Sequence, residues 1–258
     1  MQIRRGQSLK VLHINRMIPS ILTLLALSAG LNALRFALEE RWEHAVLAIV
    51  AAGVFDALDG RIARMLKGTS KFGAELDSLS DFLCFGVAPA ITLYLWAWAD
   101  SGRFGWFLVM LLCTSSALRL ARFNSDIGGE EPPWSQNFFV GVPAPAGAGT
   151  VLLPMVLWFH FESDVLRNPV LVGTFITVGA LLQVSRVRTF SFKKIRLAPA
   201  VILPTMLGVA FYVAVLVSSP WITLALTQIA YLGSLPFSIR LHRRFLRHDG
   251  VAGAPPAP

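Results

Sequence analysis

Long apolar stretches separated by short polar segments dominate the hydrophobic pattern of this chain. A helix that crosses the hydrocarbon core of a bilayer needs about 20 mostly apolar residues. Eight stretches meet this requirement and predict spans at residues 19–38, 43–65, 77–99, 104–121, 141–160, 169–186, 199–218 and 221–239. The first follows basic residues, as the core of a signal peptide does, but it is too long for one and seven further spans follow, so we expect an uncleaved helix. The pattern predicts an all-α, polytopic integral membrane bundle of about eight transmembrane helices.

The composition excludes an ordinary soluble domain. Of the 258 residues, 55% are hydrophobic and 15% are charged, whereas soluble chains average about 45–50% and 25%. The mean hydropathy is +0.61. Both cysteines, Cys84 and Cys113, lie in apolar runs, so neither a disulfide framework nor a zinc site is expected.

The basic residues alternate between the two sides of the predicted bundle. If the N-terminus is cytoplasmic, the outside loops hold only Arg41, Arg103 and Arg167, and every inside segment holds more lysine and arginine than any outside loop. The positive-inside rule then places both termini in the cytoplasm. The net charge of +8 follows from this topology and from attraction to anionic lipid heads, and we expect no nucleic-acid partner because the charges are dispersed.

Four carboxylates break the apolar pattern. Asp56 and Asp59 lie near the inner end of the second predicted span, and Asp77 and Asp81 open the third. A carboxylate inside a membrane helix costs a few kcal/mol, so it usually faces an interior or a partner. The spacings i, i+3 and i, i+4 put each pair on one helix face. A short loop joins the two helices, so we expect antiparallel neighbours whose acidic faces meet.

Converging carboxylates repel one another strongly where the dielectric constant is low. Two Mg²⁺ or Mn²⁺ ions would balance four carboxylates, and hard oxygen ligands suit these metals. No histidine accompanies the cluster, which argues against zinc. The residues alone leave two alternatives. One is a structural network of the aspartates with Arg61 and Arg64, and the other is a cation or proton pathway.

The spacing of the four aspartates belongs to a longer pattern. From Asp56 to Asp81 the chain reads D-x2-D-G-x2-A-R-x8-G-x3-D-x3-D. This pattern resembles the signature of the CDP-alcohol phosphotransferases, membrane proteins with a six-helix core that join an alcohol to a phosphatidyl or related group carried on CDP and release CMP. The resemblance implies that Asp56, Asp59, Asp77 and Asp81 bind the metals and that Asp81 also takes the proton of the acceptor hydroxyl.

The resemblance also implies contacts of Gly60, Arg64 and Ser70 with CDP-diacylglycerol. The residues agree with this implication, because Gly60 permits close ligand approach and Arg64 can hold a diphosphate oxygen. Gly73 either admits the same ligand or turns the loop before the third span.

Further segments resemble one branch of the family, the membrane-embedded bacterial enzymes that use L-serine. They are KGTSKFGAELDSLSDF, FGVAPA, ALRLARFN at 117–124 and FVGVPAPAGAG at 139–149. The resemblance implies transfer of the phosphatidyl group from CDP-diacylglycerol to L-serine, giving phosphatidylserine and CMP. Glycerol 3-phosphate, an inositol phosphate or choline as acceptor, and a carboxylate-lined cation transporter, remain as alternatives. Relatives commonly have Pro-Asn where this chain has Pro19-Ser20. Serine lacks the second polar group of the asparagine amide, so we do not expect the same nucleotide contact at this position.

Serine is a zwitterion, so its site needs a cation for the carboxylate. Arg119, Arg122 and Asn124, at the inner end of the fourth span, are the candidates. The other interpretation makes the two arginines topology anchors and Asn124 a helix cap.

These expectations give a domain plan and a location. We expect a cytoplasmic interfacial segment at 1–18, the CDP-alcohol phosphotransferase membrane domain at 19–218, an additional span at 219–240 and a basic cytoplasmic tail at 241–258. The expected location is the inner membrane, with the active site facing the cytoplasm. The expected partners are CDP-diacylglycerol, L-serine and the lipid bilayer, and a homodimer is compatible with such a bundle.

Overall fold

The fold is known from a computed structural model that describes residues 17–66, 71–98, 103–125, 138–185, 188–190 and 199–252. The interfacial segment expected before residue 17 and the predicted ligand contact Ser70 lie outside the described residues. Helices account for almost all of the structure, in the order α1 (Ile18–Leu38), α2 (Trp42–Met65), α3 (Lys71–Asp81), η2 (Phe82–Val87), α4 (Ala88–Ala97), α5 (Arg103–Ser125), α6 (Ala144–Phe161), η4 (Asp164–Arg167), α7 (Pro169–Val184), α8 (Pro199–Ser218) and α9 (Pro220–Ala252).

The helical class predicted from the sequence is confirmed, and each predicted span overlaps a helix. Four helical segments of the described chain are long and apolar enough to cross a membrane, namely Ile18–Leu38, Lys71–Ala97, Arg103–Ser125 and Ala144–Phe161. Several apolar helices of this kind make the chain a multi-pass membrane protein. The α2 helix has the length but carries the aspartates and arginines of the acidic motif, whereas α7 has 16 residues.

Two short strands are a feature that the hydrophobic pattern does not predict. β1 (Phe138–Val140) pairs antiparallel with β2 (Arg188–Phe190), with Phe138 opposite Phe190 and Val140 opposite Arg188. The strands tie the segment before α6 to the segment after α7. A strand of three residues is too short to give a recognisable alternation of apolar and polar positions in a sequence dominated by membrane helices.

Helix ends follow local chemistry. The Asn168 side chain accepts a hydrogen bond of 2.9 Å from the Val170 backbone N–H, and Pro169 occupies the first helical position of α7. A short polar side chain at the N-cap, with proline after it, is a favoured start for a helix. The C-terminal end of α6 is capped by Glu162, whose backbone lies in the left-handed region with φ of 48°.

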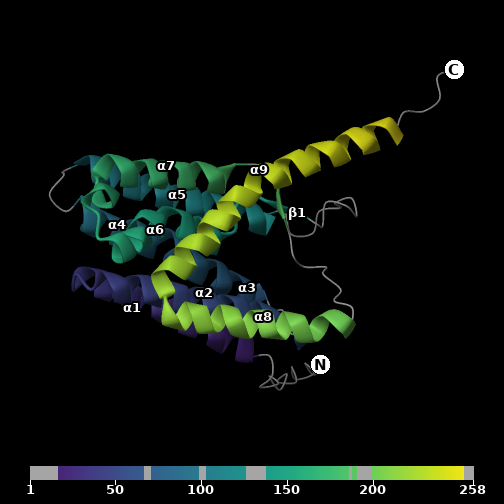
Figure 1. The fold of residues 1–258 in the computed structure, drawn as a ribbon, viewed down its shortest axis with the longest axis horizontal. Coiled ribbons are helices and arrows are strands. Elements are labelled where there is room, and N and C mark those ends of the chain that lie inside the picture. Colours follow the sequence, from purple (N-terminus) through teal and green to yellow (C-terminus); the bar gives the residue numbers. More distant parts are fainter. Residues whose placement is uncertain are drawn as a thin grey trace, which may run out of the picture.

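The bundle core lies between α4, α5, α6 and α7, and is filled by large apolar side chains. Trp96, Leu112, Met155 and Ile176 are all buried there. α1 pairs along α2 and also packs against α3, η2 and α4. In Figure 1, α9 runs obliquely across this bundle and α8 lies along its edge.

The third membrane segment contains a π-helical turn. η2 begins directly after Asp81 and joins α3 to α4, and Pro89 follows in the first turn of α4. Proline has no backbone N–H, so it cannot donate to the carbonyl four residues before it. π turns inside helices occur frequently at functional sites. A Cβ on Gly86 would lie 2.8 Å from Ser116 Oγ, so the absence of a side chain at Gly86 lets η2 approach α5 closely.

Candidate active site

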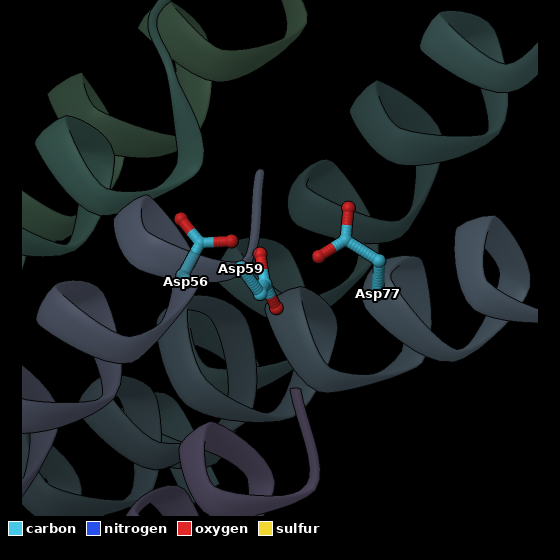
Figure 2. Close-up of side chains that lie close together, drawn as sticks. All are labelled: Asp56, Asp59 and Asp77. Atoms are coloured by element: carbon cyan, nitrogen blue, oxygen red, sulfur yellow. The ribbon is translucent and has the colours of Figure 1, made fainter. Parts of the chain in front are cut away.

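Three carboxylates meet where the inner end of α2 faces the start of α3. Asp56 and Asp59 come from α2 and Asp77 comes from α3, and Figure 2 shows the three side chains turned toward a common centre. One oxygen from each lies within 4.8 Å of the others. The prediction that the two acidic helix faces meet is therefore confirmed for these three residues.

Such a cluster is expensive without a counter-charge. At 4.8 Å and an effective dielectric constant of about 20, two unit negative charges repel by about 3.5 kcal/mol. Three such pairs sum to roughly 10 kcal/mol, which is comparable to the unfolding free energy of a whole domain, about 5–15 kcal/mol. A bound cation at this point would relieve the repulsion.

Asp81 lies one helical turn beyond Asp77 and extends the cluster. Its carboxyl group is within hydrogen-bonding reach of the Asp56 carboxyl group. It is also the last residue of α3 before the π-helical turn. All four aspartates predicted from the motif thus lie near one another, and Asp56 is close to both Asp59 and Asp81.

Thr23 is a site residue that the sequence analysis missed. Its hydroxyl oxygen lies 2.6 Å from Asp59 Oδ2 and 3.0 Å from the Pro19 carbonyl oxygen. The hydroxyl can donate only one hydrogen bond. We assign that bond to the Asp59 carboxylate, because this contact is the shorter one and the acceptor is charged. The bond fixes Asp59, which is buried. A threonine in an apolar span was the only signal available, and such threonines usually bond to their own helix.

The glycine and the arginine of the motif follow Asp59 near the C-terminal end of α2. A Cβ on Gly60 would meet no atom within 4 Å, so space for a ligand exists beside it. Arg64 Nε donates to the Gly60 carbonyl oxygen at 2.9 Å, which holds the guanidinium next to this space. Gly73 lies in the first turn of α3, rather than in the loop before it.

Of the three predicted acceptor residues, Arg119 faces the carboxylates. Its guanidinium is close enough to Asp81 and Asp56 for direct electrostatic attraction. Among the residues that the structure describes, its Nε and Nη1 are buried and have no hydrogen-bond partner. Buried N–H groups without partners cost about 1–3 kcal/mol or more each, so a polar ligand at this point would stabilise the site.

The other two predicted acceptor residues make structural contacts. Arg122 donates from Nη1 to the Val184 carbonyl oxygen at 3.0 Å and from Nη2 to the Ser185 carbonyl oxygen at 3.3 Å. It therefore caps the C-terminal end of α7, where a positive charge is favourable. Asn124 Nδ2 donates to Ser78 Oγ at 2.9 Å, which joins α5 to α3 beside the cluster.

The donor set suits a hard divalent cation. Carboxylate oxygens are the ligands that Mg²⁺ and Mn²⁺ prefer, and the three aspartates supply them from two helices that hold them in place. The apolar bundle and this cluster together define the class of protein: an integral membrane protein with an acidic site that could hold a divalent cation.

Comparison with known proteins gives the family. The chain matches the CDP-alcohol phosphatidyltransferase family over residues 16–185, and a second model of that kind, CDP-alcohol phosphatidyltransferase 2, over residues 200–236. The chain belongs to the CDP-alcohol phosphatidyltransferase family. The resemblance stated from the motif at 56–81 is confirmed.

Individual relatives extend the match over most of the chain. The chain is 34% identical to the CDP-diacylglycerol--serine O-phosphatidyltransferase of Mycobacterium tuberculosis, over 96% of this chain and 85% of that protein. It is 35% identical to the protein of the same name from Helicobacter pylori, over 69% of this chain and 73% of that protein. It is 33% identical to the archaetidylserine synthase of Methanothermobacter thermautotrophicus, over 56% of this chain and 60% of that protein.

Proposed function

We propose that this protein transfers the phosphatidyl group of CDP-diacylglycerol to L-serine, giving phosphatidylserine and CMP in phospholipid biosynthesis. The observation that carries the proposal is the cluster of Asp56, Asp59 and Asp77, with Asp81 and Arg119 directly beside it. The acceptor is inferred from the relatives, several of which are named for the serine reaction.

In the proposed site, Asp56, Asp59, Asp77 and Asp81 hold two Mg²⁺ or Mn²⁺ ions. Bound divalent cations would neutralise the diphosphate and stabilise the leaving CMP. Gly60 leaves room for the diphosphate, and the guanidinium of Arg64 beside it can donate to a diphosphate oxygen. Ser70 and Gly73 remain proposed donor contacts on the resemblance alone.

The reaction proposed for Asp81 is the removal of one proton. The serine hydroxyl oxygen attacks the phosphatidyl phosphorus, the bond from phosphorus to the CMP oxygen breaks, and the hydroxyl proton passes to the Asp81 carboxylate. A carboxylate is a weak base for an aliphatic alcohol, so it acts within the transition state, and its position contributes more than its basicity. The hydrogen-bonding reach between Asp81 and Asp56 supports a base at the edge of the proposed metal site.

The proposed site for the serine carboxylate is the guanidinium of Arg119, whose buried Nε and Nη1 have no partner in the described chain. Arg122 and Asn124 support this site by holding α7 and α3 against α5. This division gives Arg119 the ligand contact and gives its two neighbours positioning roles.

A lysine scan of the two arginines tests this division. Arg119→Lys keeps the charge but loses the planar fork, so the KM for serine should rise by about tenfold or more, while the KM for CDP-diacylglycerol changes little. Arg122→Lys is the matched control: it should lower the thermal stability, because an ammonium cannot hold both carbonyl oxygens, and leave the KM for serine near its original value. Equal changes in the KM for serine in both variants would contradict this division and would show that Arg122 also contributes to acceptor binding.

The function itself is tested with purified full-length protein, CDP-diacylglycerol and a panel of labelled alcohols. We expect CMP release and a labelled lipid with L-serine. Labelling by glycerol 3-phosphate, an inositol phosphate or choline in place of serine would contradict the acceptor. Absence of CMP release with every alcohol would contradict the transferase activity and would favour the alternative of a carboxylate-lined cation transporter.

We further propose eight spans in the inner membrane, with both termini and the active site on the cytoplasmic side, as the distribution of basic residues predicts. The domain plan is the one given by the sequence, in which 19–218 forms the catalytic membrane domain. α9 runs without a break from Pro220 to Ala252, so the last span and the start of the basic tail share one helix. Pairing with a second copy remains part of the proposal.

Cysteine labelling checks this topology. In a background with Cys84 and Cys113 replaced by alanine, a cysteine in the 67–71 loop or at Phe190 should react only with reagent on the cytoplasmic side. A cysteine at Arg41 or Arg103 should react from outside. Labelling of the 67–71 loop from outside would overturn the orientation and with it the access of serine to the site.

A further inference from the structure

The last helix, α9, brings a tyrosine to the acceptor side of the site. The hydroxyl oxygen of Tyr231 is buried, and the phenol lies close enough to the Arg119 guanidinium of α5 for an electrostatic interaction. Tyr231 belongs to the segment at 200–236 that matches the second family model, whereas the carboxylates and arginines of the site all lie within residues 16–185. The contact between these two side chains therefore joins the C-terminal segment to the site.

Tyr231 projects from the face of α9 that packs against the bundle. Leu235 on this face is buried, and Gln228 donates from Nε2 to the Ala146 carbonyl oxygen at 3.0 Å and to Thr150 Oγ1 at 2.7 Å. Successive residues of a helix are rotated by about 100°, so Tyr231 lies about 60° from Gln228 and about 40° from Leu235. The two hydrogen bonds to α6 thus hold α9 with the Tyr231 side turned toward the bundle.

The course of α9 agrees with a contact between Tyr231 and Arg119. α9 packs against both α6 and β2. β2 pairs with β1, which directly precedes α6 in the chain, so α9 reaches the end of the bundle at which α6 begins and α7 ends. Arg122, one helical turn after Arg119, donates to the carbonyl oxygens of Val184 and Ser185 at that same end. Tyr231 and Arg119 therefore meet there from different helices.

The side chains around Arg119 differ in what they offer to an anionic ligand. Asp56 and Asp81 are carboxylates, which repel an anion, and Arg122 already donates to two carbonyl oxygens of α7. A phenol is uncharged at neutral pH and donates one hydrogen bond. A carboxylate has about four lone-pair sites, of which a bidentate guanidinium fills two. Tyr231 is therefore suited to be a second donor to a carboxylate held by Arg119.

We propose that the Tyr231 hydroxyl donates a hydrogen bond to the carboxylate of the acceptor amino acid, next to Arg119, and so contributes to the choice of acceptor. The proposal rests on the proposed function for the identity of that acceptor. A site built to hydrogen-bond one group of its substrate rejects analogues that lack the group. Tyr231 therefore favours acceptors that carry a carboxylate.

Two tyrosine-to-phenylalanine variants of the full-length enzyme test the role of the hydroxyl. Tyr231→Phe keeps the ring, so the KM for serine should rise about tenfold, as expected for the loss of one hydrogen bond to a charged group, while kcat and the KM for CDP-diacylglycerol change little. Tyr212→Phe is the matched control, because the Tyr212 hydroxyl lies 3.1 Å from Thr227 Oγ1 at an exposed contact between α8 and α9. It should leave the KM for serine unchanged. An unchanged KM for serine in Tyr231→Phe, or equal increases in the two variants, would overturn the proposal.

A double-mutant cycle with Arg119→Lys separates a shared ligand contact from a structural role of Tyr231. If both side chains hold one carboxylate, the rise in the KM for serine in the double variant should be smaller than the product of the two single rises. Multiplicative effects, or a KM for CDP-diacylglycerol that rises as much as that for serine, would overturn the proposal. Absence of serine-dependent CMP release from the original protein would contradict the proposed function and this inference together. An unchanged KM in Tyr231→Phe of a serine-active enzyme would contradict only the role of Tyr231.

Discussion

Removal of divalent cations should abolish phosphatidyl transfer, and added Mg²⁺ or Mn²⁺ should restore it. The reason is electrostatic: three carboxylates with oxygens within 4.8 Å of one another repel by roughly 10 kcal/mol in total at an effective dielectric constant of about 20. A diphosphate brought to such a site would add further negative charge. CMP release measured after treatment with EDTA, and again across a metal titration, checks this expectation.

Charge-neutral variants separate metal binding from a general loss of structure. Asp56→Asn and Asp77→Asn should each shift the metal titration to higher concentration, because each removes a charged ligand. Glu75→Gln is the matched control, because Glu75 is an exposed carboxylate on the same helix as Asp77. Full activity in metal-free buffer, or the same titration midpoint in all three variants, would contradict a metal site at this cluster.

Asp81→Asn should lower turnover by about 100-fold or more, the usual contribution of a positioned general base, while CDP-diacylglycerol still binds. Asp81 lies outside the group of three carboxylates whose oxygens are within 4.8 Å of one another, so donor binding should depend less on this substitution than on those at Asp56 or Asp77. Rates of CMP release at saturating serine, together with direct donor titrations, check both parts. A variant that loses donor binding and turnover in proportion would make Asp81 a metal ligand alone.

The arginines show why the acceptor site could not be predicted from the sequence. Arg119 and Arg122 are separated by about one helical turn near the inner end of the same span, and the residues around them do not distinguish their roles. In the structure, Arg122 donates to two carbonyl oxygens of α7, from 62 and 63 residues away in the chain. Arg119 instead faces Asp81 and Asp56. Only the packing of α5 against α7 distinguishes a helix cap from a ligand contact.

Thr23 was missed for the same reason. It is a polar residue within an apolar span, where the usual partner is a backbone carbonyl of its own helix. Its hydroxyl group bonds to Asp59, 36 residues away in the chain. Contacts of this length depend on which helices become neighbours, and hydrophobic periodicity does not specify that.

By itself, the sequence determined the helical membrane class, the approximate limits of the helices and the meeting of the four aspartates. These features follow from local chemistry: the length of apolar runs, and carboxylates spaced on one face of two helices joined by a short loop. The tertiary structure alone decided the partner of Asp59, the separate positions of the two arginines and the small sheet. Those features arise where side chains from distant segments pack together, and the energy that selects them belongs to the contact, not to either segment alone.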